Sequence, residues 1–152
     1  MASKLLESIG LKMTLAKFQI IIISHATLCK GYLDAVRLVL NSECKNIDTL
    51  SFTENMAIEE FERSLRKAIA GNETKKVVIL SDIVGGTPTN VATKFIINDE
   101  ILTVAGVNFP LLLELVLLQE SGDEISQESL RKVIIDARSS LFCINDFLEG
   151  EK

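Results

Sequence analysis

The sequence predicts an α/β fold in which a parallel sheet is covered by helices on both faces. Short β-rich runs alternate along the chain with segments of helical periodicity, as in consecutive βαβ units. Two of these runs are continuously apolar, as expected of central strands buried on both faces. The chain has 152 residues and contains no internal repeat or Pro/Ser-rich linker, so we expect one domain.

The first half of the chain predicts two strands, each followed by a helix. Phe18–Ser24 is a buried strand, and Thr27–Leu40 then carries apolar residues at helical spacing. Ile47–Phe52 alternates in character and suits a strand at the sheet edge. Met56–Ala70 has apolar residues at steps of three and four, and Gly71 follows where a helix often ends.

The second half repeats the alternation. The predicted elements are a strand, a helix, a strand and two helices, at Lys76–Ser81, from Thr87, at Ile101–Ala105, at Leu111–Glu120 and at Gln127–Ala137. Pro88 and Pro110 fall in the first turns of the two helices that directly follow strands. A proline costs no hydrogen bond there, because the first N–H groups of a helix have no partner within it.

The two ends of the chain carry weaker patterns. Ser140–Phe147 alternates weakly and predicts one more strand, which we place antiparallel at the sheet edge because no crossover follows it. Residues 1–13 are expected to form a leader without an assigned role. Residues 14–152 then make up the single domain.

Composition narrows the functional class. The formal net charge of −5 opposes binding to nucleic acid, although it is compatible with a partner protein that has a basic face. Apolar runs such as Phe18–Ile23 and Leu111–Leu118 end well short of the roughly 20 residues of a membrane span. The first residues lack the pattern of a signal peptide. We therefore expect a cytoplasmic protein.

The three cysteines, Cys29, Cys44 and Cys143, lack the spacing of a metal site or a disulfide framework. We interpret them as reduced thiols and expect no bound metal and no cofactor. Cys29 is four residues from His25, so a Cys/His nucleophile pair is an alternative. The helical pattern around Cys29 favours a structural role instead.

Three segments break the strand–helix pattern at the carboxyl ends of predicted strands, the edge where such sheets bind ligands. These segments are Ser24–Thr27, Ser81–Asn90 and Gly106–Pro110. If the first and third strands are neighbours, His25 and Asp82 meet at the switch point of the sheet.

Each of these residue types suits the transfer of a phosphoryl group. His25, the only histidine, has a ring nitrogen that is able to attack phosphorus. A carboxylate such as Asp82 on the other nitrogen would fix the tautomer and stabilise the charge that develops on the ring. Gly85 and Gly86 would let backbone N–H groups approach an anion at a helix N-terminus, and Thr87 adds a hydroxyl donor.

Structural interpretations compete with this one. A single histidine is most often a surface or core residue, an aspartate after a strand is often a helix cap, and Gly-Gly-Thr-Pro is a common turn. The glycine pair matches neither a P-loop nor a dinucleotide-binding motif. The predicted gathering of His25, Asp82 and the glycine pair in one crevice favours the functional interpretation.

Three motifs carry a resemblance to a known family. They are S-H-A-T-L-C-K-G-Y-L-D-A, S-D-I-V-G-G-T-P-T-N and V-A-G-V-N-F-P-L-L-L-E. In this order, from about Lys17 to about Phe147, the chain resembles the IIA component of the mannose/fructose/sorbose-type sugar phosphotransferase system, the mannose family. The resemblance implies a flavodoxin-like doubly wound sheet of order 2-1-3-4 whose C-terminal antiparallel strand is exchanged in a homodimer.

The resemblance also implies partners and roles. The phosphocarrier protein HPr would phosphorylate His25, and the IIB component would receive the phosphate, so contact with the membrane is indirect, through the transporter. Asp82 resembles the residue that orients the histidine, and Gly85, Gly86 and Thr87 resemble the phosphate-proximal loop. Two positions depart from the family: Ala26 replaces a usual glycine, and Ile83 replaces an occasional hydroxyl residue.

Alternatives remain on the same fold. One is the phosphotransferase subunit of a dihydroxyacetone kinase, although its loop after the third strand usually differs from GGTPTN. Others are a IIA-like regulatory module without phosphate relay and a flavodoxin-like cofactor binder. A response-regulator receiver is disfavoured, because the first strand ends in Ser24-His25 rather than in acidic residues. Neither the sugar nor the phosphorylated imidazole nitrogen follows from the sequence.

Overall fold

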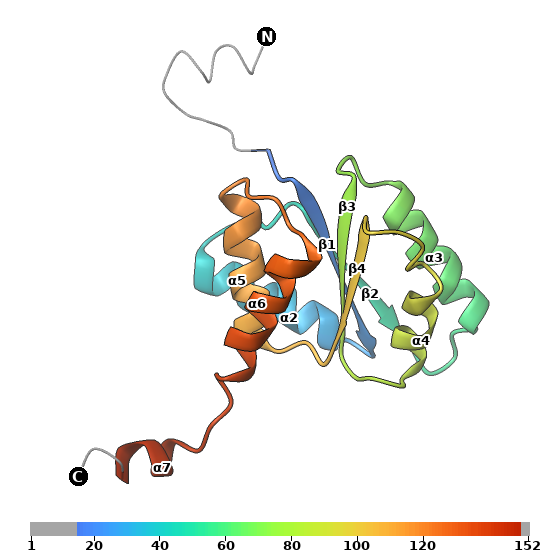
Figure 1. Ribbon diagram of the computed structural model, residues 1–152. Helices are drawn as coiled ribbons and strands as arrows, with labels where there is room; N and C mark the ends of the chain where they lie inside the picture. The colour runs from blue at the N-terminus through green and yellow to red at the C-terminus, as the bar shows by residue number, and fades with distance from the viewer. Residues whose placement is uncertain (1–14, 150–152) are drawn as a thin grey trace, which may run out of the picture.

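Four parallel strands form the centre of the molecule in this computed structural model, which describes residues 15–149 (Figure 1). Their order is β2-β1-β3-β4, so the predicted sheet order is confirmed. The strands are β1 (Phe18–His25), β2 (Ile47–Phe52), β3 (Lys76–Ser81) and β4 (Ile101–Ala105). Their bounds agree with the prediction except that β1 extends by one residue, to His25.

Five helices cover the two faces of the sheet (Figure 1). On one face lie α2, α5 and α6, and on the other lie α3 and α4. The bounds of these helices are α2 Leu28–Leu40, α3 Ile58–Ala70, α4 Thr87–Thr93, α5 Phe109–Glu120 and α6 Gln127–Arg138. The start of α5 lies two residues before the predicted Leu111, because the Asn108 side chain caps the helix and accepts the Leu111 N–H at 2.9 Å.

The apolar run of β1 is explained by burial on both faces. Ile20 and Ile22 pack with α2, α5 and α6, whereas Ile21 and Ile23 pack with α3 and α4. All four isoleucines are fully buried. Each such side chain contributes about 1.5–3 kcal/mol relative to exposure, so β1 is fixed in register against both helix layers.

The topology creates a switch point between β1 and β3. The chain leaves β1 toward α2 on one face, and it leaves β3 toward α4 on the opposite face. β1 and β3 are hydrogen-bonded neighbours, with Ile23 paired to Ser81. The loops after these strands therefore diverge at the carboxyl edge of the sheet, where folds of this kind bind ligands.

The predicted antiparallel strand at Ser140–Phe147 is not found in the described chain. Ile144–Glu149 forms a short helix, α7, which extends away from the sheet and buries none of its residues (Figure 1). Ile144, Phe147 and Leu148 stand at i, i+3 and i+4, so the sequence fits a helix as well as a weak alternation. A strand also needs a partner for its backbone groups, and the tail of this single chain does not pair with the sheet.

Two other predictions concern the N-terminal leader and the lack of a membrane-spanning segment. The leader, residues 1–13, lies outside the described residues. Within residues 15–149, no helix has the length and apolar character that crossing a bilayer demands.

Candidate functional site

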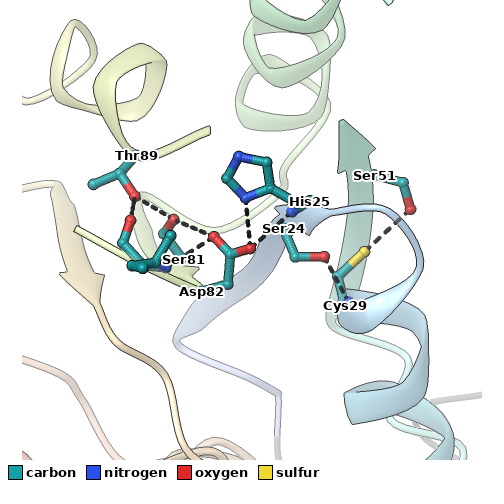
Figure 2. Close-up of polar contacts among 8 residues, drawn as sticks. Ser24, His25, Cys29, Ser51, Ser81, Asp82 and Thr89 are labelled. Atoms are coloured by element: carbon teal, nitrogen blue, oxygen red, sulfur yellow. Dashed lines mark hydrogen bonds and ion pairs between the residues drawn. The ribbon is translucent and has the colours of Figure 1, made fainter. Parts of the chain in front are cut away.

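The structure brings His25 and Asp82 into direct contact at the switch point (Figure 2). His25 is the last residue of β1, and Asp82 directly follows β3. The imidazole Nδ1 lies 2.8 Å from Asp82 Oδ2. The imidazole is 47% exposed, whereas the Asp82 side chain is only 10% exposed. The acid is therefore held inside while the ring faces solvent.

Asp82 is fixed by donors from both strand ends. Its Oδ2 also accepts the backbone N–H of His25 at 2.8 Å, and its Oδ1 accepts the N–H of Ile83 at 2.9 Å. Burial raises the pKa of Asp82, but the donated hydrogen bonds from His25 and Ile83 and the nearby imidazole lower it by more, so the pKa lies below its ordinary value. Asp82 is a carboxylate at neutral pH, with both oxygens used as acceptors.

This geometry distinguishes the two imidazole nitrogens. A neutral ring that faces a carboxylate through Nδ1 carries its proton there, which leaves Nε2 with a free lone pair. Phe52 packs edge-on against the same ring, with centroids 6.1 Å apart and planes at 84°. The ring is thus held from the Nδ1 side by Asp82 and from one flank by Phe52.

Gly86 lies beside the imidazole, where the sequence predicted that the glycine pair would gather with His25. A Cβ added to Gly86 would stand 2.7 Å from Cε1 and 3.4 Å from Nε2 of His25, so only a glycine fits without displacing the ring. Gly85 has a φ of +80°, and its carbonyl accepts a bond from the Asn90 side chain at 3.1 Å. Thr87 follows directly as the first residue of α4. The backbone of Gly86 therefore lies against the edge of the ring that carries Cε1 and the free nitrogen.

Ala26 adopts an unusual backbone conformation next to the histidine. Its φ is +48°, in the left-handed region, and its N–H donates to the Phe52 carbonyl at 2.9 Å. The conformation costs a residue with a Cβ about 1–2 kcal/mol. A glycine, which the resemblance implies at this position, would avoid this cost, so Ala26 is a source of local strain.

The thiol of Cys29 is not part of the site. Cys29 is fully buried, its N–H donates to Ser24 Oγ at 2.8 Å, and its sulfur lies 3.3 Å from Ser51 Oγ. Figure 2 shows the sulfur directed toward Ser51 and not toward the imidazole. The structural interpretation of this cysteine is the one that fits. No cluster of three metal-binding side chains occurs within residues 15–149.

Sequence reasoning missed several residues that hold the site. Ser81 and Thr89 form a buried hydroxyl pair behind Asp82, with oxygens 2.6 Å apart (Figure 2). Tyr32 of α2 donates to the Val107 carbonyl at 2.9 Å and so connects α2 to the loop after β4. Burial and the charge of Asp82 raise the pKa of Tyr32, which keeps the phenol protonated. The hydroxyl of Ser81 at the end of the apolar run of β3 was the available signal.

Comparison with known proteins identifies the family of this fold and site. Residues 19–134 match the family described as PTS system fructose IIA component, EIIA-man. The chain belongs to this family. The resemblance inferred from the three motifs is therefore confirmed, and the protein is a mannose-family IIA component of a sugar phosphotransferase system.

Individual relatives agree with the family. The IIA component is 27% identical to the sorbose-specific EIIA component of Lacticaseibacillus casei over 72% of this chain and 78% of that protein. It is 36% identical to the fructose-specific EIIA component of Bacillus subtilis over 51% of this chain and 55% of that protein. A PTS IIA protein associated with the fucose utilization operon of Streptococcus pneumoniae superposes with a TM-score of 0.78 at 27% identity, over 90% of this chain and 99% of that one.

Proposed function

We propose that this IIA component is a phosphocarrier that accepts a phosphoryl group from HPr on Nε2 of His25 and passes it to the IIB component. The observation that carries the proposal is the contact of 2.8 Å between Nδ1 and the Asp82 carboxylate. This contact leaves Nε2 as the free nitrogen of a half-exposed ring. The role would place the protein in the cytoplasm, where it meets the membrane only through its transporter partners.

The chemistry is an exchange of one N–P bond for another. The Nε2 lone pair of neutral His25 attacks the phosphorus of the phosphohistidine on HPr, and the electron pair of the breaking N–P bond returns to the donor imidazole. The His25 ring becomes positively charged, and the Asp82 carboxylate stabilises that charge through the Nδ1–H bond. In the second transfer, a nucleophile of IIB attacks the same phosphorus, and the electron pair returns to Nε2.

The loop from Gly85 to Thr87 is proposed to contact the phosphoryl oxygens. Gly86 is the residue whose backbone lies against Cε1 and Nε2, so its neighbours are in reach of a group on that nitrogen. Backbone N–H groups and the Thr87 hydroxyl would donate to the oxygens. The first transfer moves the group between two imidazole nitrogens, and we propose no metal or cofactor for it.

An exposed ring needs a protein partner to exclude water during transfer. Ile83 and Val84, on the loop that carries Asp82, are 56% and 78% exposed, and Leu28 at the start of α2 is 50% exposed. Apolar side chains beside a reactive group favour docking of a partner protein. In this proposal, Ile83 contributes partner contact in place of the phosphate-binding hydroxyl that some family members carry.

The direct test is phosphorylation in a reconstituted system. The protein is incubated with phosphoenolpyruvate, enzyme I and HPr, and acid-labile phosphate is measured with and without a IIB component. We expect one phosphate per chain on the wild type and none on His25→Ala, because the chain has a single histidine. Loading without onward transfer to any IIB would indicate a regulatory module. Transfer to a dihydroxyacetone kinase subunit would indicate the other phosphotransferase role.

A further inference from the structure

Behind Asp82, two hydroxyl groups are buried where the sheet meets α4. Ser81 is the last residue of β3 and is fully buried, and Thr89 on α4 is 6% exposed. Their oxygens lie 2.6 Å apart. Thr89 Oγ1 also donates to the Ile83 carbonyl, and Ser81 Oγ lies 3.5 Å from Asp82 Oδ1 (Figure 2). The pair therefore touches both ends of the Asp82–Ile83 segment.

Ser81 and Thr89 have one hydroxyl proton each, and this fixes which of the two donates to the other. The carbonyl of Ile83 can only accept, so the bond to it uses the Thr89 proton. Thr89 Oγ1 then accepts the proton of Ser81. The distance of 3.5 Å from Ser81 to Asp82 Oδ1 is at the limit of a hydrogen bond, so the Ser81 proton has Thr89 as its main acceptor.

Both backbone groups of Ile83 are therefore occupied on the inner side of the loop. Its N–H donates to Asp82 Oδ1 at 2.9 Å, and its carbonyl accepts from Thr89. The Ser81 carbonyl, one residue before Asp82, accepts the N–H groups of Gly106 and Val107 at 2.9 Å each. Asp82 thus stands between two anchored peptide units.

We propose that Thr89, oriented by Ser81, is a positioning residue that holds the Asp82 carboxylate against Nδ1 of His25. The inference rests on the proposed role of His25 and Asp82 in phosphoryl transfer, and it assigns a part of that machinery that does not touch the ring. Loss of the Thr89 hydroxyl would leave the Ile83 carbonyl without its donor. It would also leave Ser81 with Asp82 Oδ1 as its nearest acceptor. Both changes shift the carboxylate relative to Nδ1.

The test compares three substitutions on α4. Thr89→Val removes the hydroxyl and keeps the shape of the side chain, and Thr89→Ser restores the hydroxyl. Thr93→Val is the matched control, because Thr93 Oγ1 donates at 2.7 Å to the Asn90 carbonyl on the same helix, outside the hydroxyl pair. We expect phosphoryl transfer from HPr to fall about tenfold in Thr89→Val, as for loss of one hydrogen bond of ordinary strength. Thr89→Ser and Thr93→Val should stay within about threefold of the wild type.

A second measurement is independent of transfer. Because the chain has one histidine, ¹⁵N-histidine labelling gives the signals of a single imidazole, whose two ¹⁵N shifts report which nitrogen is protonated. At a pH where the ¹⁵N shifts themselves show a neutral ring, the wild type should show a protonated Nδ1. Thr89→Val should show an increased fraction protonated on Nε2, and Thr89→Ser should match the wild type.

Unchanged ring shifts in Thr89→Val would overturn the inference, as would a loss of transfer that Thr89→Ser fails to restore, since Thr89 would then act by packing alone. If even the wild type accepts no phosphate, the proposed function fails, and the ring shifts alone decide on Thr89.

Discussion

Two regions of this IIA component expose apolar side chains, and the chain supports them in opposite ways. The site loop exposes Ile83 and Val84, yet its backbone is anchored by hydrogen bonds to the side chains of Asp82, Thr89 and Asn90. The tail exposes a larger apolar set, Leu141, Phe142, Ile144, Phe147 and Leu148, and none of its residues from 140 to 149 is buried. The site loop is therefore held in place by contacts within one chain. The tail lacks such contacts, and its exposed apolar side chains are suited to contact with a second chain.

The largest effect is expected from a substitution in the site loop. Asp82→Asn should slow phosphoryl transfer about 10² to 10⁴-fold, because an amide does not stabilise the positive ring. The structure adds a second reason. Asp82 accepts through both oxygens, from His25 and from Ile83, and an amide offers one acceptor oxygen only. Transfer rates from HPr are the measurement. Asp48→Asn on β2, where the carboxylate accepts from Gln19 at 3.0 Å, is the control.

Asp82→Asn should also change how the free energy of unfolding depends on pH. The pKa of Asp82 is lowered in the folded protein from its ordinary 3.8. The carboxylate therefore stabilises the fold fully above pH 3.8, and this contribution is lost as the pH falls through the lower folded pKa. The gap in unfolding free energy between wild type and Asp82→Asn should narrow on acidification. A constant gap would mean that the folded pKa of Asp82 is not lowered, and a wild-type transfer rate would leave Asp82 with a structural role alone.

A charged substitution in the tail, residues 140–149, tests whether the tail forms a dimer contact. We predict a homodimer in which Leu141, Phe142, Ile144 and Phe147 contact a second copy. Ile144→Asp, at a side chain that is 65% exposed, should raise the dimer dissociation constant about 10- to 100-fold, as for loss of one buried apolar side chain. Leu38→Asp on α2, 84% exposed, is the matched control. Sedimentation velocity at micromolar concentration measures the effect, and a monomeric wild type would contradict the prediction.

Thr87→Val tests the phosphate side of the site loop with a smaller change. Removing a hydroxyl donor to a charged oxygen should cost about 1.5–3 kcal/mol of transition-state stabilisation, roughly 10- to 150-fold in transfer rate. Thr93→Val again serves as the control on the same helix. Equal rates for the two variants would show that Thr87 does not contact the phosphoryl group.

The smallest effect concerns strain beside the histidine. Ala26→Gly should raise the free energy of unfolding by about 1 kcal/mol, because glycine tolerates a φ of +48° without the steric cost. Gly also adds entropy to the unfolded chain, which limits the gain. Chemical denaturation with urea measures it. Ala35→Gly in the interior of α2 is the control, and it should destabilise by a similar amount. Destabilisation by Ala26→Gly would mean that the strain is already relieved.

The sheet and the residues of the candidate site could be predicted from the sequence, because both depend on short sequence patterns. Continuous apolar runs identify strands buried on two faces, such as Phe18–Ser24, and prolines after strands identify helix starts. His25, Asp82 and Gly86 follow as residues at strand ends. The structure brings all three together. Their part in phosphate transfer stays a prediction.

What the tertiary structure alone decided is how these groups are held. That Asp82 takes Nδ1, that Gly86 lies against Cε1, and that Thr89 holds the Ile83 carbonyl are contacts between segments whose distances no periodicity encodes. For the tail, the sequence did not decide even the type of secondary structure. Its spacing fits strand and helix equally, and such a segment takes its conformation from whatever surface its backbone and apolar side chains meet. Burial patterns in the sequence thus determined the sheet and its helices, whereas hydrogen bonds between segments determined how the side chains of the proposed site are held.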